Sequence, residues 1–210
     1  KNMLNFLENH DEQRIASEFF AGNPFKAIPA MVISACMNTN PVMIYFGQEL
    51  GEKGMDEEGF SGRDGRTTIF DYWTVDTIRR WRSGGKFDGK MLTKEEKKLQ
   101  NFYSTLLNLC NKEKAIREGV FFDLTYANLE GIVFNEHKQY AFFRKAGKEL
   151  IFIIVNFDEK PAAPCVKIPT HAFDYLGIPF KDNYKAKDLL TGNTETLVMA
   201  PDQCTQILLE

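Results

Sequence analysis

Phe6-Leu7-Glu8-Asn9-His10-Asp11 is the segment that decides the fold of this chain. It follows an apolar start at Met3 and Leu4, and it ends in three polar side chains in a row. An apolar run bounded by such a cluster predicts a buried strand that delivers polar groups at its tip. In parallel α/β proteins the carboxyl ends of strands carry the chemistry, so His10 and Asp11 are candidate site residues. A strand end followed by an aspartate helix cap would give the same pattern.

The composition is that of an ordinary soluble globular protein. The 210 residues suffice for one large domain or two small ones, with 43% hydrophobic and 26% charged residues. A formal net charge of -3 gives no reason to expect nucleic acid as a partner. No apolar run approaches the ~20 residues that a membrane span needs. Because the chain opens at Lys1, directly before a predicted strand, we expect it to be a C-terminal piece of a longer protein.

The four cysteines show no metal-binding pattern. They are Cys36, Cys110, Cys165 and Cys204, and none forms a Cys-x-x-Cys pair or has a histidine at ligand spacing. Four cysteines permit three disulfide connectivities, and the spacing favours none of them. Since each has apolar neighbours, we expect buried free thiols and no metal site in this chain.

A strand, a helix and a second strand follow one another in the first fifty or so residues. Asn23-Pro24 is a helix-start signal, and Asn38 to Pro41 is the corresponding stop. Val42 to Phe46 then has the composition of a fully buried strand. This order predicts a right-handed βαβ crossover between parallel strands.

The pattern changes from helical to alternating after residue 118. Before it, the capping box Thr93-Lys94-Glu95-Glu96 starts a helix that reaches about Lys112. After it, alternation predicts eight short strands: Phe121 to Leu124, Ile132 to Phe134, Gln139 to Arg144, Glu149 to Asn156, Ala162 to Ile168, Tyr184 to Leu190, Glu195 to Met199 and Thr205 to Leu209. Lys145 to Lys148 is the expected hairpin turn. We therefore predict two domains, 1–118 and 119–210, the second an antiparallel β-sandwich.

Three segments resemble the α-amylase superfamily (glycoside hydrolase family 13). Phe6 to Asp11 resembles its last conserved region, at the tip of the seventh barrel strand, and Tyr45-Phe46-Gly47-Gln48-Glu49 resembles the end of the eighth. Ile151 to Phe157 is similar to a strand of its C-terminal sandwich. The resemblance implies an α/β plus all-β fold: the C-terminal quarter of a (β/α)8 TIM barrel, followed by an antiparallel β-sandwich.

The resemblance also implies site residues. The transition-state-stabilising carboxylate of the superfamily falls on Asp11, and its substrate-binding histidine falls on His10. Arg63-Asp64-Gly65-Arg66-Thr67 is similar to an Arg-Asp-x-x-Arg-Thr run in oligosaccharide-cleaving relatives, but it is one residue shorter. This similarity implies that Asp64 and Arg66 contact sugar hydroxyls. A solvated loop with a local Asp64–Arg66 pair is the alternative.

The implied function is part of a retaining α-glucan-cleaving glycoside hydrolase of α-amylase type. Its nucleophile and general acid would lie upstream, so this chain alone is expected to be inactive. The expected partner is an α-1,4-glucan or maltooligosaccharide, which favours a secreted or periplasmic protein. We expect no cofactor in this chain, and any calcium ligands upstream. Self-association through exposed barrel strands is expected, and Gln48 and Glu49 are expected to be structural.

Three alternatives remain open from the sequence. An α-glucan transglycosylase or branching enzyme would share every motif. A non-catalytic amylase-like protein would bind or assemble rather than cleave, although such relatives tend to lose catalytic carboxylates and Asp11 is present. The sandwich could be a carbohydrate-binding module, but no row of exposed aromatic residues is obvious, which favours a structural role. His137 and His171 have no neighbour at a telling spacing, and we assign them no role.

Overall fold

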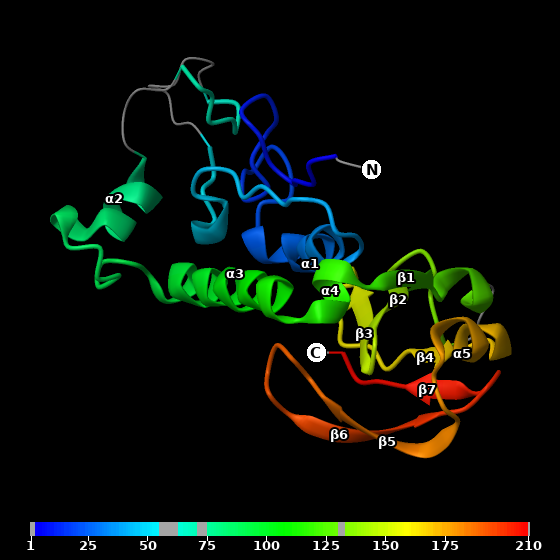
Figure 1. Cartoon of the computed structure of the whole chain (residues 1–210). Coiled ribbons are helices and arrows are strands. Elements are labelled where there is room, and N and C mark those ends of the chain that lie inside the picture. Colours follow the sequence, from blue (N-terminus) through cyan, green and yellow to red (C-terminus); the bar gives the residue numbers. More distant parts are fainter. Residues whose placement is uncertain (1–2, 55–62, 71–74, 130–132, 210) are drawn as a thin grey trace. The chain divides into compact units, whose positions relative to one another are not determined.

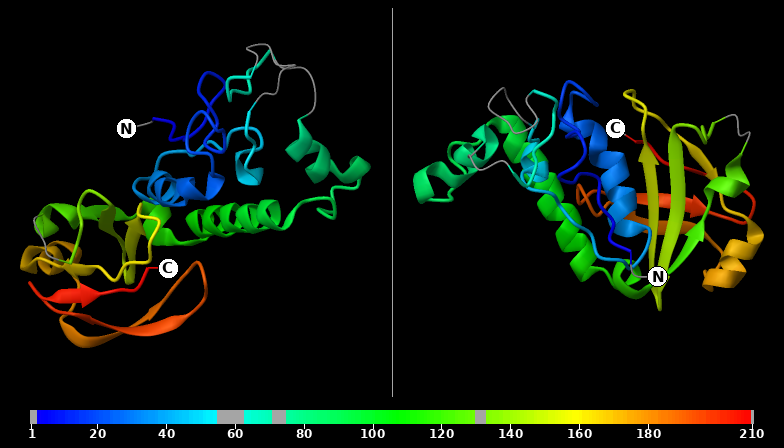
Figure 2. Two further views of the ribbon diagram at one scale, coloured as in Figure 1. Left: turned by 180° about the vertical axis from the view of Figure 1, so that it is seen from behind. Right: turned by 90° about the horizontal axis from the view of Figure 1, so that it is seen from above.

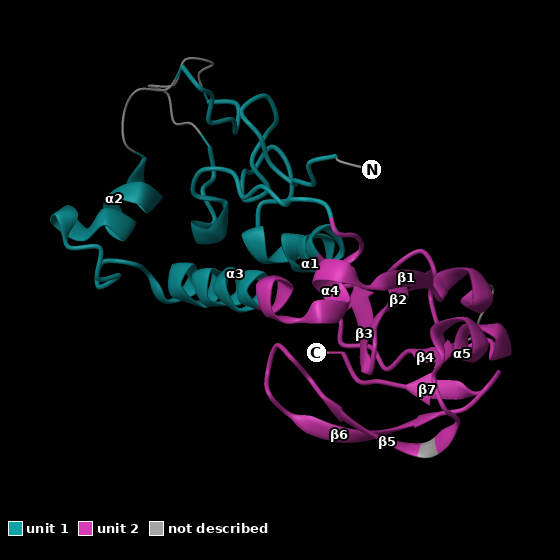
Figure 3. Ribbon diagram, viewed as in Figure 1, with its two compact units in different colours: residues 1–35, 40–108 teal, residues 36–39, 109–210 magenta. Residues whose placement is uncertain are grey.

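The computed structural model describes residues 3–54, 63–70, 75–129 and 133–209, without the side chain of residue 182. The chain forms two compact units, shown in Figure 3: unit 1 is residues 1–35 and 40–108, and unit 2 is residues 36–39 and 109–210. Apart from residues 36–39, the units divide at 108/109, and the domain boundary at 118 stays a prediction. Residues 55–62, within the glycine-rich stretch from Gly51 to Arg66, and Ile132 of a predicted strand lie outside the described residues.

Unit 1 consists of short helices and the loops between them. Its elements are η1 (Pro24–Ala27), α1 (Ile28–Cys36), η2 (Gln48–Leu50), α2 (Asp76–Arg82), η3 (Ser83–Gly85) and α3 (Lys94–Lys112), labelled in part in Figure 1. The predicted helix start is confirmed, because Asn23 Oδ1 accepts a hydrogen bond of 3.0 Å from Phe25 N. The first turn is a 3-10 helix, and the α-helix begins only at Ile28.

Helix α3 agrees with its prediction at both ends. Thr93 Oγ1 accepts from Glu96 N at 3.1 Å, and Glu96 Oε2 accepts from Thr93 N at 2.7 Å, which is the predicted capping box. Leu99, Tyr103 and Leu106 recur at helical spacing on one face of α3, and all three are buried. This face of α3 therefore contributes to the core of unit 1.

The two predicted barrel strands meet in one parallel bridge, between Asn5 and Val42. Asn5 N donates to Pro41 O at 2.9 Å, and Met43 N donates to Asn5 O at 2.9 Å. The parallel direction is as predicted, but the prediction of regular, buried strands is wrong: Met3 is 73% exposed. Parallel strands are normally covered on both faces and paired with neighbours, and the described residues supply a single short pairing here.

Unit 2 contains three antiparallel sheets, which Figure 2 shows from two further sides. The first has the order β1–β2–β3, and the other two are the ladders β4–β7 and β5–β6. The strands are β1 (Val120–Asp123), β2 (Gln139–Ala146), β3 (Glu149–Asn156), β4 (Cys165–Lys167), β5 (Lys181–Lys187), β6 (Thr194–Met199) and β7 (Cys204–Gln206). Helices α4 (Lys114–Glu118), η4 (Thr125–Asn128) and α5 (Thr170–Leu176) complete the unit. The predicted β2–β3 hairpin is confirmed, with Gly147 at φ +56° in its turn.

The prediction of a strand over Ile132 to Phe134 is wrong for its two described residues. Val133 and Phe134 lie outside any strand, although Phe134 is a core residue at 2% exposure. The sequence pattern also gave no signal for α5, which lies between the strands predicted at 162–168 and 184–190. That helix follows Pro169 and ends at Gly177, whose φ of +59° lets its N–H bond back to Asp174 O at 3.3 Å.

The core of unit 2 joins its sheets and α5. It is made of apolar side chains from β2, β4, α5, β6 and the connecting loops: Leu124, Phe134, Ala141, Phe143, Val166, Ile168, Ala172, Phe173, Leu176, Ile178, Leu197 and Met199. The other face of β2 carries Arg144, which is also buried and donates to Ala115 O at 3.1 Å and Ile116 O at 2.7 Å. These bonds tie α4 to β2, so α4 belongs to unit 2.

The expectation of four free thiols is wrong for one pair. Cys165 and Cys204 form a disulfide with Cα atoms 5.2 Å apart, because the β4–β7 ladder brings together residues that are 39 positions apart. Cys36 and Cys110 are not disulfide-bonded, and their Sγ atoms lie 3.9 Å apart. Cys36 is buried, as expected, and Cys110 is half-buried.

Candidate functional site

His10 and Asp11 lie on a turn that Asn9 holds. Asn9 Oδ1 accepts from Asp11 N at 2.8 Å and from Glu12 N at 2.9 Å, and such side-chain bonds fix the backbone of a turn. His10 Nε2 lies 3.4 Å from Asp11 Oδ2, and the two side chains are 46% and 76% exposed. The structure therefore brings the two principal predicted residues together, at the surface of unit 1.

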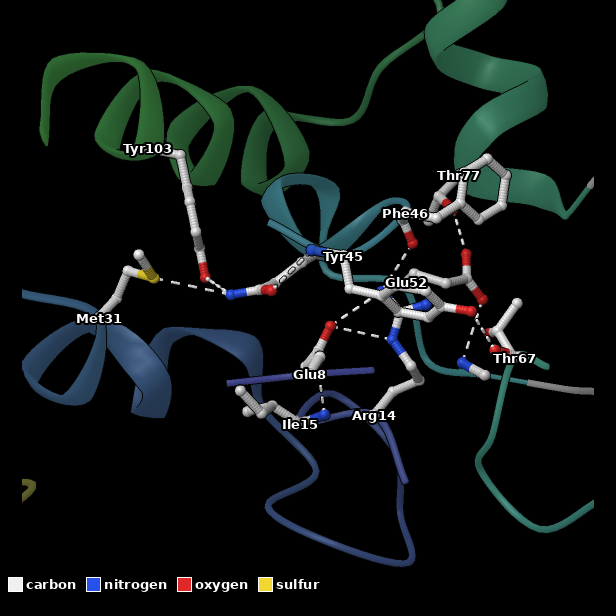
Figure 4. Close-up of polar contacts among 12 residues, drawn as sticks. Glu8, Arg14, Ile15, Met31, Tyr45, Phe46, Glu52, Thr67, Thr77 and Tyr103 are labelled. Atoms are coloured by element: carbon white, nitrogen blue, oxygen red, sulfur yellow. Dashed lines mark hydrogen bonds and ion pairs between the residues drawn. The ribbon is translucent and has the colours of Figure 1, made fainter. Parts of the chain in front are cut away.

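A buried ion pair lies behind this turn. Arg14 Nη2 and Glu8 Oε2 are 2.9 Å apart, with side chains 0% and 3% exposed (Figure 4). The second carboxylate oxygen, Glu8 Oε1, accepts from Ile15 N at 2.7 Å. Breaking such a pair would leave an uncompensated buried charge, so both ends of the turn are firmly anchored. The sequence pattern alone gave no reason to assign a role to Glu8 or Arg14.

Arg14 also joins the turn to two other segments. Its Nη2 donates to Phe46 O at 2.8 Å, and its guanidinium lies 4.9 Å from the ring centroid of Tyr45. Its backbone N donates to Gly65 O at 2.7 Å. Tyr45 OH in turn donates to Thr67 O at 2.6 Å. The turn of Asp11, the end of the Val42–Phe46 segment and the loop at 63–67 thus form one connected network.

Asp64 and Arg66 are paired with each other in that loop. Arg66 Nη2 lies 2.5 Å from Asp64 Oδ2, and Arg66 N donates to Asp64 Oδ1 at 3.0 Å. Desolvation raises the pKa of Asp64, but the hydrogen bonds from the side chain and backbone of Arg66 outweigh it and hold this pKa below its ordinary value. Hydrogen bonding to Asp64 raises the pKa of Arg66, and the charge of Asp11 acts in the same direction. Their predicted contact with sugar stays a prediction.

The loop carrying Asp64 and Arg66 depends on two glycines. Gly65 has φ +81°, and a Cβ there would lie 2.1 Å from Ser17 Oγ. Gly54 has φ +91°, and a Cβ there would lie 2.3 Å from the carbonyl carbon of Gly65. Only glycine permits both this backbone conformation and this close approach.

The residues after the Tyr45–Phe46 segment support the site from the interior of unit 1. Gln48 is buried, donates to Tyr103 OH at 3.0 Å and accepts from Tyr45 N at 3.1 Å, which confirms its predicted structural role. Burial raises the pKa of Tyr103 to about 12. Burial also raises the pKa of Glu49. Glu52 accepts from Gly54 N at 3.1 Å and from the hydroxyl of Thr77, linking this loop to α2.

The chemistry available at this site is that of one carboxylate beside one imidazole. Such a pair can accept and donate hydrogen bonds to neighbouring hydroxyls. A retaining glycosidase needs two further carboxyl groups about 5 Å apart, for attack and for protonation. Over the described ranges, no three His, Cys, Asp or Glu side chains gather as metal ligands would. No helix in the same ranges is long and apolar enough to cross a membrane.

Comparisons with known proteins give a match at the level of structure. No protein-family model matches this sequence. No curated protein matches it either.

Three solved structures illustrate the structural match. A noncanonic maltogenic α-amylase, AmyB from Thermotoga neapolitana, superposes with a TM-score of 0.62 at 14% identity, over 98% of this chain and 38% of that one. AmyP in complex with maltose gives 0.62 at 19% identity, over 98% of this chain and 38% of that one. A cyclomaltodextrinase gives 0.59 at 20% identity, over 99% and 28% respectively.

All three are much longer than this chain, which spans at most 38% of their length. The match nevertheless runs through both units, because at least 98% of this chain is covered in each case. This chain therefore has the fold of the C-terminal region of α-amylase-type glycoside hydrolases, as its sequence resemblance predicted.

Proposed function

We propose that this chain is the part of a retaining α-glucan-cleaving hydrolase that supplies the transition-state-stabilising Asp11 and the hydroxyl-binding His10. The observation that carries the proposal is the exposed His10–Asp11 pair, 3.4 Å apart, on a turn whose base is the buried Glu8–Arg14 ion pair. An exposed pair can meet a substrate, and a buried anchor keeps it in one orientation. The nucleophile and the general acid would come from residues outside these 210, so the chain alone would be inactive.

The proposed role of Asp11 is differential binding. Glycoside hydrolysis passes through an oxocarbenium-like transition state in which the sugar ring is distorted. Hydrogen bonds from sugar hydroxyls to a charged acceptor are stronger than neutral ones, and they gain further strength as positive charge develops on the ring. A carboxylate at Asp11 would therefore bind the distorted ring more tightly than the relaxed one, which lowers the barrier. His10 would hold the same hydroxyls from beside it.

Asp64 and Arg66 would extend this hydroxyl-binding surface. The hydrogen bond from Arg14 N to Gly65 O attaches their loop to the turn of Asp11, and the charge of Asp11 acts on Arg66. The lowered pKa of Asp64 keeps its carboxylate ionised and therefore able to accept. The planar guanidinium of Arg66 would donate hydrogen bonds to sugar hydroxyls in a fixed arrangement.

The proposed substrate is an α-1,4-glucan or a maltooligosaccharide. It is supported by the maltose held in the similar AmyP structure. The same residues would serve an α-glucan transglycosylase or branching enzyme, since both reactions pass through the same kind of transition state. A non-catalytic amylase-like protein would bind the sugar without cleaving it.

A product analysis on maltoheptaose tests the proposal and separates these functions. We expect the whole enzyme, in which barrel strands precede this chain, to release short maltooligosaccharides. We expect the isolated 210-residue chain to release none. Products longer than maltoheptaose would indicate a transglycosylase instead of a hydrolase. Binding of maltoheptaose without any new product would indicate a non-catalytic binding protein. Reducing sugar released by the isolated chain would contradict the proposed division of catalytic residues.

A further inference from the structure

Unit 2 carries a surface depression that the proposed function does not use. Its volume is about 530 Å³, and its lining residues come from β1, η4 and α5. The lining combines aromatic rings with two carboxylates and one imidazole, principally Phe122, Asp123, Tyr126, His171, Asp174 and Tyr175. Small-molecule sites are typically ~300–1,000 Å³, mostly apolar, and contain a few placed polar groups. The depression has this size and this composition.

The rings are arranged around Phe122. Its ring centroid lies 5.7 Å from that of His171 and 5.7 Å from that of Tyr175, both in tilted contact. The hydroxyl of Tyr126 is hydrogen-bonded to His171 Nε2, which links η4 to α5 across 45 positions of sequence. Because neighbouring rings hold one another, the surface is pre-organised and would lose little freedom when a ligand binds.

Two of these rings remain largely in water. Tyr175 is 65% exposed, whereas Phe173 on the same short helix is 1% exposed and belongs to the core. Tyr126 is 46% exposed. Helix α5 therefore buries one aromatic side chain and presents another to solvent, beside a second exposed ring. A clustered apolar surface with polar groups at its edge is characteristic of a binding site.

The polar groups at the edge are suited to hydroxyls. Asp123 is held in place because its Oδ1 accepts from Thr125 N at 2.8 Å, and Asp174 is exposed on α5. Ionised carboxylates are strong acceptors for O–H donors. Desolvation and the charge of Asp123 raise the pKa of Tyr126, so its phenol stays protonated and polar.

We infer that this depression is a second saccharide-binding site, which takes glucose units of an α-glucan chain on the rings of Tyr126 and Tyr175. A pyranose ring has an apolar C–H face that packs on an aromatic ring and hydroxyls at its edge that reach carboxylates. The identity of the sugar rests on the proposed function, but the residues are independent of His10 and Asp11. A small organic cation is the competing ligand, since aromatic faces beside carboxylates also attract cations.

Titration of the ¹⁵N-labelled 210-residue chain with maltoheptaose tests this inference. The backbone amide signals of residues 122–126 and 171–175 are expected to shift together, with one dissociation constant. Tyr175→Ala is expected to weaken that binding about three- to tenfold. Phe157→Ala is the matched control, because Phe157 is 48% exposed in unit 2 but lies outside the depression's lining. An unchanged unfolding midpoint for Tyr175→Ala would show that the variant is folded.

The outcomes separate this inference from the proposed function. Asp11→Asn is expected to leave the shifts at residues 122–126 and 171–175 unchanged. If Asp11→Asn leaves hydrolysis by the enzyme that contains this chain unchanged, the proposed function fails. The amide shifts at residues 122–126 and 171–175 would still show whether the depression binds maltoheptaose. The inference is overturned if maltoheptaose shifts none of these signals, if Phe157→Ala weakens binding as much as Tyr175→Ala, or if tetramethylammonium shifts them and maltoheptaose does not.

Discussion

Glu8 and Arg14 form a 2.9 Å ion pair in which neither side chain is more than 3% exposed, and between them in sequence lie His10 and Asp11. The exposed His10–Asp11 pair is thus carried on a turn whose two ends are fixed to each other inside unit 1. Arg14 additionally fixes the loop of Asp64 and Arg66 through Gly65 O. The pair is therefore the anchor of all four predicted site residues.

Removing one partner of this pair should destabilise unit 1 strongly. Glu8→Gln leaves the buried guanidinium of Arg14 without its counter-charge, so we expect a loss of about 3–5 kcal/mol of unfolding free energy. The matched control is Glu18→Gln, which removes the Arg63–Glu18 pair whose side chains are 61% and 63% exposed. That surface pair should contribute less than about 1 kcal/mol. Urea unfolding measures both variants, and equal losses would refute the anchoring role.

Glu96 should contribute stability that depends on pH. Desolvation raises its pKa, but hydrogen bonds from Arg80 and from Thr93 outweigh this and lower the pKa below its ordinary 4.5. The unfolded chain then binds the proton more readily than the folded one, so the contribution is present above pH 4.5 and is lost as pH falls through the folded pKa. Glu96→Gln should therefore cost about 1–3 kcal/mol at pH 7 and progressively less toward pH 3.

The exposed neighbour Glu95 supplies the control for that experiment. Glu95→Gln removes the same charge one position away, without the bonds to Arg80. Its effect on the unfolding free energy at pH 7 should be small, because Glu95 is exposed. A Glu96→Gln difference that stays constant from pH 7 to pH 3 would contradict the linkage.

The cysteines should differ in reactivity toward iodoacetamide. The hydrogen bond with Cys110 and burial raise the pKa of Cys36, whereas accepting that bond lowers the pKa of Cys110. Because the thiolate is the nucleophile, Cys110 should be alkylated first in the folded chain. After unfolding without reductant, mass spectrometry should find label at Cys36 and Cys110 but not at the disulfide-bonded Cys165 and Cys204. Label at the latter two would contradict the pairing.

The isolated chain should self-associate through the segment around Asn5. Leu4 and Phe6 are 46% and 43% exposed, and Phe46 is 49% exposed. Exposed apolar side chains on neighbouring extended segments favour association with another copy. Size-exclusion chromatography with light scattering should show a concentration-dependent mass that Phe6→Ser reduces. A monomer at every concentration would contradict this expectation.

The parts of the fold that local signals determine were predictable from the sequence. The capping box at Thr93 and Glu96 fixes the start of α3, and both of its hydrogen bonds join residues three positions apart. The hairpin of β2 and β3 pairs adjacent segments in a single register. In both cases the interacting residues are neighbours in sequence, so periodicity and turn chemistry suffice.

The parts that distant residues determine were not predictable in this way. The Cys165–Cys204 disulfide depends on the β4–β7 ladder, and the short helix α5 lies among segments with strand-like periodicity. The depression lined by Phe122 and Tyr175 combines Tyr126 with His171, two residues that sequence patterns gave no reason to connect. The Glu8–Arg14 pair had only the weak signal of opposite charges on either side of the motif. Burial, which makes that pair important, is a property of the folded unit.

The central claim is that Asp11 stabilises the transition state of glycoside hydrolysis. It is tested most directly by the kinetics of Asp11→Asn, on maltoheptaose, in the enzyme that contains this chain. We expect kcat to fall about 10²–10³-fold with KM little changed, because the lost hydrogen bonds matter chiefly in the transition state. Glu12→Gln, which removes the adjacent charge, should retain activity. A kcat for Asp11→Asn within a few-fold of the unaltered enzyme would contradict the account.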